Sequence, residues 1–226
     1  MILFRHQYNL KISIITMTPF LRKLNLTAHV SFSVGWFGAV VAFLALAITG
    51  LISESSLMVR SSYLGMELIG WLVIVPACLL SLQTGLIQSL GTQWGLFRHY
   101  WILVKFIFTV ISTIILFLHM QPISYLADLA SRAEISGSEL RGLRIQLIAD
   151  AGAAFLVLLI TTTISVYKPW GRTPYGLRVQ YEQNKRMLTG GLRTKKRWGL
   201  YVLLGLIAVV IVLYIILHIT GVLRGH

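Results

Sequence analysis

The 226-residue chain is 56% hydrophobic and only 12% charged, whereas soluble domains average about 25% charged residues. This shortage of charge excludes an ordinary soluble globular domain and predicts an all-α, polytopic membrane protein. The net charge of +13 is concentrated in two segments, and the single cysteine, Cys78, excludes an intrachain disulfide and a cysteine-based metal site.

The first segment, residues 1–23, is short and basic, with Arg5, Lys11, Arg22 and Lys23. It lacks the small-residue cleavage site of a secretory signal. Met17 offers a second start, so residues 1–16 are either a dispensable extension or a segment that lies at the membrane interface.

The first predicted membrane span, residues 24–53, contains no charged side chain. It exceeds the ~20 residues that cross a bilayer core, so its helix should tilt or project into water. His29, Ser33 and Trp36 fall on one face of this helix.

The second predicted span, residues 63–90, has Glu67 near its start and Pro76 in its middle. Because a proline removes one backbone hydrogen bond from a helix, we expect a kink at Pro76.

The third predicted span, residues 98–120, carries ionisable side chains in an apolar run, with Lys105 inside it and His99 and His119 near its ends. Lys105, Thr109, Ser112 and His119 share one face. A lipid-facing helix rarely carries such a stripe, so this face should meet protein, water or a bound group. Lys105 either extends its ammonium to the membrane surface or binds an anionic ligand group.

A loop over residues 121–144 should follow, in which Asp128 and Arg132 can pair four residues apart on a short helix. The fourth helix should begin near Gly137, outside the membrane, because Ser136 and Glu139 have the spacing of a capping box. The fourth predicted span, residues 145–167, holds Asp150 about one turn inside the apolar region.

The spans define the expected domain organisation. Residues 24–167 should form a four-helix membrane bundle, followed by a basic cytoplasmic connector at 168–197 with nine Lys or Arg and one acid. Residues 198–226 hold a fifth transmembrane helix, which should flank the bundle.

Five spans place the two termini on opposite sides of the membrane. The side that carries residues 1–23 and 168–197 holds 14 of the 20 Lys and Arg residues, and the other side holds five. The positive-inside rule therefore predicts a bacterial cytoplasmic membrane protein with its N-terminus in the cytoplasm and its C-terminus outside.

The connector at 168–197 should contact the membrane surface. Basic residues beside a bilayer attract anionic lipid headgroups by ~1 kcal/mol each, and Trp170, Tyr175 and Trp198 suit the interface. We therefore expect the lipid bilayer and anionic headgroups as partners and no nucleic acid; a homo- or hetero-oligomer stays open.

Two hypotheses cover the ionisable groups within the spans. His29 with His99 or His119 is a candidate ligand pair for haem b, which needs imidazoles from different helices. Three ionisable residues on three different helices lie at similar depth: Glu67, His119 and Asp150. They should form either a structural hydrogen-bonded cluster or a path for protons or cations.

Four segments carry a family resemblance: LTAHVSFSVGWFGAVVAFLAL, MELIGWLVIVP, GLFRHYWILVKF and ISVYKPWGRTPYG. Over about residues 17–177 they resemble an uncharacterised family of bacterial integral membrane proteins of unknown function.

A more distant similarity rests on His29, which shortly precedes a run with Trp36, and on the Trp-x-x-x-Lys pattern of Trp101 and Lys105. These features are similar to haem-associated membrane bundles of the copper-resistance D type and the membrane-bound protoporphyrinogen oxidase type. The similarity implies haem contacts for His29, Trp36 and Lys105. Leu103 departs from the oxidase pattern, which has a histidine at that place.

The chain contains no Walker loop, Rossmann glycine pattern, Cys-x-x-Cys-His or nucleophile elbow, so the sequence assigns no enzymatic activity. Three function classes stay open: a haem b-binding or redox-associated membrane bundle, a non-enzymatic structural or accessory membrane component, and a small-ion or metal transporter.

Overall fold

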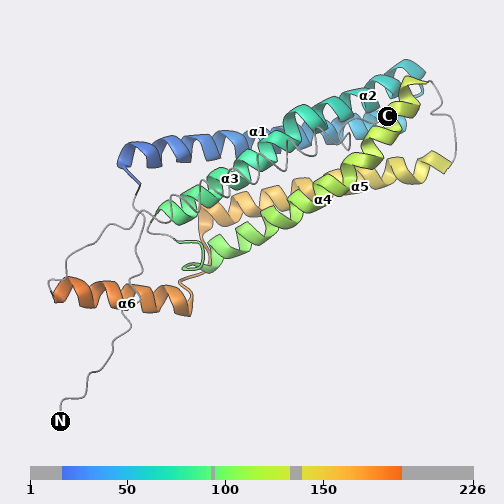
Figure 1. Cartoon of the computed structure of the whole chain (residues 1–226). Coiled ribbons are helices and arrows are strands. Elements are labelled where there is room, and N and C mark those ends of the chain that lie inside the picture. The colour runs from blue at the N-terminus through green and yellow to red at the C-terminus, as the bar shows by residue number, and fades with distance from the viewer. Residues whose placement is uncertain (1–16, 93–94, 133–138, 190–226) are drawn as a thin grey trace, which may run out of the picture.

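A computed structural model describes residues 17–92, 95–132 and 139–189 of the chain. Every regular element in these ranges is a helix, and a single isolated bridge joins His99 to Arg172. The elements are α1 (Pro19–Ile52), α2 (Ser56–Ile69), η1 (Gly70–Ile74), α3 (Val75–Gly91), α4 (Tyr100–Ser131), α5 (Glu139–Tyr167) and α6 (Pro174–Leu188). The all-helical prediction is confirmed for these residues (Figure 1).

Four helical segments are long and apolar enough to cross a membrane, and they correspond to the first four predicted spans. They are Pro19–Ile52, Ser56–Gly91, Tyr100–Ser131 and Leu140–Tyr167. The predicted fifth span lies outside the described residues.

The first helix begins earlier than predicted. Thr18 caps it, because its hydroxyl accepts a hydrogen bond from the Leu21 N–H at 3.3 Å, and Pro19 follows in the first turn. Proline is favoured there because the first N–H groups of a helix have no intrahelical acceptor.

The predicted irregularity of the second span lies just before Pro76. A π-helical turn, η1, separates α2 from α3, and Pro76 falls in the first turn of α3. The wider turn lets the chain pass a proline, whose nitrogen donates no hydrogen bond, without ending the helix.

The predicted break after residue 120 is wrong, and the short helix predicted around Asp128 is the end of α4. Helix α4 continues through Pro122 to Ser131, and Asp128 and Arg132 form an ion pair at its end, with 3.0 Å between Oδ2 and Nη2. The reason is packing, since the last three turns bury one apolar face and so outweigh the lost backbone hydrogen bond. That face comprises Ile123, Leu126, Ala127 and Ala130.

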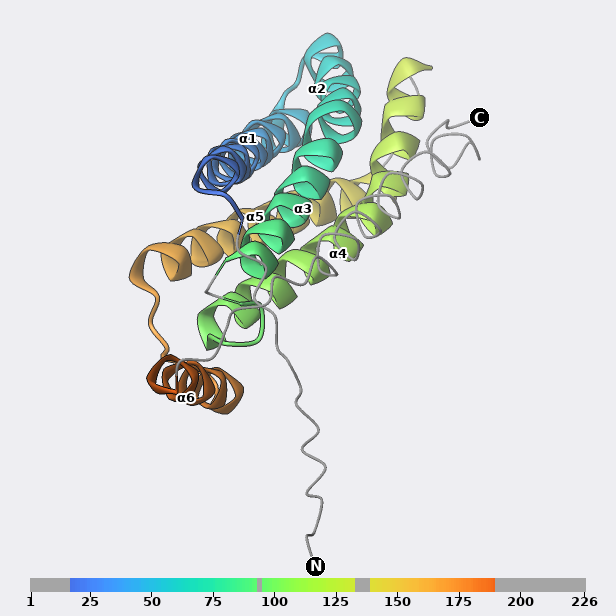
Figure 2. The same cartoon turned by 60° about the vertical axis from the view of Figure 1, so that its left-hand side comes forward.

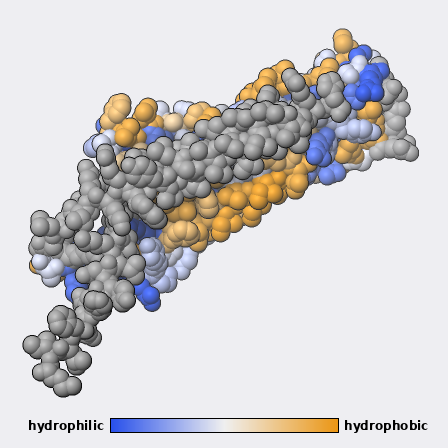
Figure 3. Space-filling view, viewed as in Figure 1, coloured by the Kyte–Doolittle hydropathy of each residue, from blue (hydrophilic) through white to orange (hydrophobic). Residues whose placement is uncertain are grey.

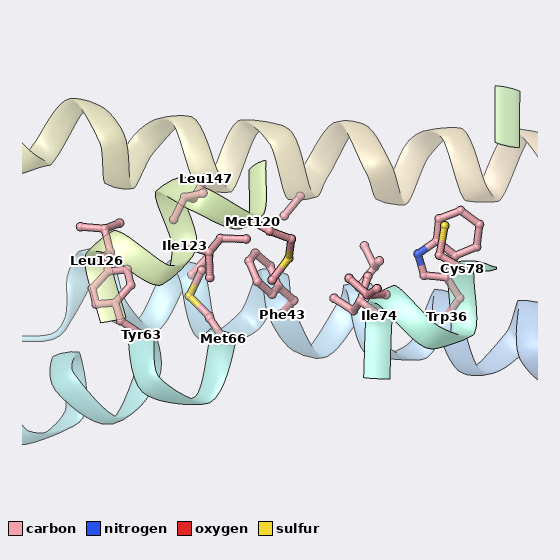
Figure 4. Close-up of a cluster of buried hydrophobic side chains, with 14 of the residues drawn as sticks. Trp36, Phe43, Tyr63, Met66, Ile74, Cys78, Met120, Ile123, Leu126 and Leu147 are labelled. Carbon is pink, nitrogen blue, oxygen red and sulfur yellow. The ribbon is translucent and has the colours of Figure 1, made fainter. Parts of the chain in front are cut away.

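Helices α1 to α5 pack side by side and form what we call the helical body. Helix α1 packs against α2, α3 and α5, and α4 packs against the same three helices. The apolar core contains large side chains from all five helices, as Figure 4 shows for Trp36, Phe43, Met66, Met120 and Leu147 among others.

The outside of the helical body is also apolar. Val34, Leu72 and Leu118 are each about two-thirds exposed, at 65%, 67% and 67%. Figure 3 shows apolar side chains along the visible face and polar ones gathered toward the two ends. A surface of this kind suits contact with lipid rather than with water.

Helix α6 lies beyond one end of the helical body (Figures 1 and 2). At this end α1 begins, α3 ends, α4 begins and α5 ends, and the Met17 N–H donates to the Gly91 carbonyl at 3.2 Å. We call it the basic end, because the described chain places eight Lys and Arg residues in or beside it: Arg22, Lys23, Arg98, Lys168, Arg172, Arg178, Lys185 and Arg186.

Candidate functional site

Polar side chains join α1 to α3 in a line that we call the polar seam. It consists of Asn25, His29 and Ser33 on α1, and Ser81, Thr84 and Gln88 on α3. Residues four apart on α1 face residues three or four apart on α3, so the helical repeat brings both sets together. Sequence analysis found His29 and Ser33 but not their partners.

The seam is held by short contacts. The Asn25 amide donates to the Thr84 carbonyl at 3.0 Å and to Gln88 Oε1 at 2.9 Å. The hydroxyls of Ser33 and Ser81 are 2.8 Å apart. Hydrogen bonds between membrane helices stabilise their packing by about 0.6 kcal/mol each.

His29 lies at the centre of the seam. Its Nδ1 is 3.1 Å from the Ser81 carbonyl, which can only accept, so the hydrogen-bond network assigns the proton to Nδ1. Its ring lies over Gly85, where an added Cβ would be 3.0 Å from His29 Cε1. The lone pair of neutral His29 is therefore on Nε2.

The other residues of the haem hypothesis lie in different surroundings. Lys105 is half-buried on α4 and forms no ion pair with any described residue. Trp36 is 4% exposed within the apolar core. His99 is 9% exposed beside Arg172 at the basic end. Within the described ranges, no three His, Cys, Asp or Glu residues gather as metal ligands.

His119 and Asp150 form an ion pair between α4 and α5, with 2.8 Å between Nε2 and Oδ2. The other ring nitrogen, Nδ1, is 2.8 Å from the Ile115 carbonyl. Both ring nitrogens of His119 therefore face hydrogen-bond acceptors, one a carbonyl and the other a carboxylate. Glu67, the third member of the predicted cluster, has no ion pair to a described residue.

Arg144 on α5 makes contacts that the sequence did not predict, because residue 144 falls at the end of the predicted loop. Its Nε donates to the Tyr63 hydroxyl at 2.7 Å, and its Nη2 donates to the Gly50 carbonyl. Its guanidinium also lies over the Tyr63 ring, 5.5 Å from the centroid. One arginine thus links α5 to α2 and α1.

The basic end contains a pocket of about 160 Å³ between α6 and the turn before α4. We call it the end pocket, and its lining residues are Arg98, His99, Arg172, Gly176, Val179, Gln180 and Gln183. Two of the seven are arginines, and none is acidic. The sequence placed Arg98 and Arg172 on one side of the membrane but could not show that they meet.

Backbone contacts build the end pocket. The Thr173 N–H donates to the Arg98 carbonyl at 2.9 Å, and its hydroxyl donates to the Phe97 carbonyl at 2.6 Å. Gly176 approaches the Arg98 carbonyl so closely that a side chain at 176 would collide with it. Gly95, with φ +61°, turns the chain so that the Arg98 side chain folds back over it.

The charge of Arg98 is affected by its surroundings. Burial and the neighbouring Arg172 lower the pKa of Arg98, and Tyr175 raises it. Since an arginine ordinarily titrates far above neutral pH, the Arg98 guanidinium stays charged despite this shift. The end pocket therefore presents two like charges on one side of a docked helix.

The chain was also compared with known proteins. No protein-family model matches it, and neither a curated protein nor a solved structure does.

Proposed function

We propose that this chain is an integral protein of a bacterial cytoplasmic membrane whose basic end binds anionic lipid headgroups. In this proposal the four long helices form a transmembrane bundle, and residues 198–226 add a fifth span at its side. The N-terminus and α6 lie in the cytoplasm, as the excess of Lys and Arg at this end supports.

The observation that carries the proposal is the composition and placement of α6. Arg178 and Lys185 are exposed on it, and so are Tyr175 and Tyr181. Its face toward the body is held by Thr173, Gly176 and Val179. A helix that docks on one face and exposes cations and tyrosines on others suits the headgroup region of an anionic membrane.

The proposal is tested by lipid competition in vesicles that contain the full chain. Quenching of tryptophan fluorescence by brominated phosphatidylglycerol, against brominated phosphatidylcholine, measures the preference for anionic lipid. We expect Arg178→Gln to lower that preference by about fivefold at low salt, the equivalent of ~1 kcal/mol per basic residue.

Arg141→Gln is the matched control, because Arg141 is exposed on α5 at the opposite end of the helical body. This variant should leave the protein's preference for anionic lipid at the basic end unchanged. Equal quenching by the two lipids in the unaltered protein contradicts the proposal.

The polar groups inside the helical body support a structural role. Each member of the polar seam hydrogen-bonds to another member of the seam, so the seam joins α1 to α3 without a bound group. We propose that it serves helix packing.

Haem b binding is the second candidate, and one observation favours it. The Nδ1 proton of His29 is directed to a backbone carbonyl, as in many histidines that ligate metal through Nε2. Full-chain protein purified from haem-replete cells should then show a Soret band that His29→Ala weakens. A colourless preparation contradicts the haem proposal and leaves the lipid proposal intact.

A further inference from the structure

We propose that the end pocket is a discrete site for one phosphate group, carried either by a lipid headgroup or by a free phosphate. The headgroup source rests on the proposed function, since it needs this end to lie at the membrane surface. The free-phosphate source does not.

The first argument is the way in which two guanidiniums are brought together. Arg98 precedes α4 and Arg172 precedes α6, and both line the same pocket. The His99–Arg172 bridge and the Thr173 contacts to Phe97 and Arg98 fix both segments through their backbones. A site fixed by the backbone loses little conformational entropy when a ligand binds.

The second argument is that the lining of the pocket is positively charged. Arg98 and Arg172 both line it, and none of the seven lining residues carries a carboxylate. Because opposite charges attract, a lining of this composition favours an anionic ligand over a neutral or cationic one.

The third argument concerns the chemical class of the anion. An arginine presents a planar fork of N–H donors that matches pairs of phosphate oxygens, and two arginines can engage different edges of one phosphate. The side-chain amides of Gln180 and Gln183 add donors on the α6 wall. A phosphate offers more oxygens and more charge than a carboxylate, so it satisfies more of these donors.

Size limits the ligand as well. The volume of about 160 Å³ lies below the roughly 300–1,000 Å³ of pockets that enclose drug-sized molecules. The pocket therefore suits a headgroup phosphate or inorganic phosphate, with the remainder of a lipid outside it.

The test uses the full chain in neutral detergent, where no bilayer surface contributes. Two probes are titrated separately, inorganic phosphate and a short-chain phosphatidic acid, with short-chain phosphatidylcholine, which is zwitterionic and has no net charge, as the reference. The readout is the dissociation constant from isothermal titration. Arg172→Gln should weaken phosphate binding by roughly tenfold or more, as expected for a lost charged hydrogen bond.

Arg141→Gln is the matched control. It removes the same charge from an exposed site on α5 at the opposite end of the helical body, and Arg141 does not line the pocket. We expect its affinity for either probe to stay within about twofold of the unaltered protein, since the site is local. Arg172→Lys, which keeps the charge and loses the fork, should bind with an intermediate affinity.

The outcomes separate the sources and the proposals. Saturable binding of inorganic phosphate, weakened by Arg172→Gln alone, supports a site for free phosphate; binding of phosphatidic acid alone supports a headgroup site. No saturable binding of either probe, or equal weakening by Arg172→Gln and Arg141→Gln, overturns the site. The vesicle preference for phosphatidylglycerol is measured separately, so either proposal can fail without the other.

Discussion

The polar seam and the end pocket are two polar regions of one apolar protein, and they differ in how their groups are matched. In the seam, donors on one helix meet acceptors on the other, as with Asn25 and Gln88. In the end pocket, two cations are held together and the lining contains no anion. The seam's donors and acceptors are matched within the chain, whereas the lining of the pocket is positively charged and so favours an anionic ligand.

The comparison separates stability from binding. A hydrogen bond between helices in a membrane contributes modestly to packing, and its loss should lower the free energy of unfolding. A positively charged pocket that binds an anion should contribute little to stability, and removing one of its arginines should lower the affinity for that anion. Substitutions in the two regions should therefore have opposite signatures.

The largest effect is expected where the pocket is assembled. Gly176→Val places a side chain against the Arg98 carbonyl, so α6 should leave the turn before α4. Phosphate binding in detergent should then fall by at least about tenfold, since both arginines no longer face one site. Gly171→Val is the matched control, because a Cβ at Gly171 meets nothing within 4 Å. Equal losses for both variants would contradict the pocket geometry.

A smaller effect is expected at the His119–Asp150 ion pair. Asp150→Asn removes the carboxylate from a pair whose side chains are 24% and 32% exposed. Stability should fall by about 1–2 kcal/mol, below the 3–5 kcal/mol of a fully buried pair. Unfolding in mixed micelles measures this, and phosphate binding should be unchanged. A proton or cation flux in vesicles that Asp150→Asn abolishes would instead favour transport.

The centre of the seam should give a stability change of about 1 kcal/mol. His29→Leu removes the contacts of Nδ1 with Ser81 and Thr84, and membrane helix hydrogen bonds average about 0.6 kcal/mol. Steric trapping or unfolding in micelles measures it. Ser31→Ala, at an exposed site on α1, is the control. If His29→Leu changes phosphate affinity and not stability, the distinction between the two regions fails.

The smallest effect is expected at the end of the seam. Asn25→Leu removes the amide that contacts the Thr84 carbonyl and Gln88, and leaves a partly buried site near the start of α1. The same unfolding assay should show a loss of about 0.5 kcal/mol, since the freed groups can reach water there. A loss larger than that of His29→Leu would place the main polar contact at this end of the seam.

The sequence predicted what depends on composition and local spacing. Four helices follow from long apolar runs, and the Asp128–Arg132 pair follows from its i, i+4 spacing. The continuation of α4 through Pro122 does not follow from the sequence, because its stability comes from a buried face that forms only against other helices. The sequence predicted a kink at Pro76, but it did not predict that the distortion would be a π-helical turn before the proline.

The sites depend more on tertiary contacts. His119 and Asp150 share a depth that can be counted along the chain, and the structure pairs them. Asn25, Thr84 and Gln88 are uncharged, so nothing in the sequence distinguishes their roles from those of other polar residues. Arg98 and Arg172 meet only because α6 docks at Gly176, and a charge count along the chain cannot reveal that contact.

The most direct test is the dissociation constant of inorganic phosphate for Arg172→Gln and His29→Leu, measured side by side in detergent. The account predicts weakening by roughly tenfold or more for Arg172→Gln and no change for His29→Leu. Equal affinities in the two variants, or a loss confined to His29→Leu, would contradict it.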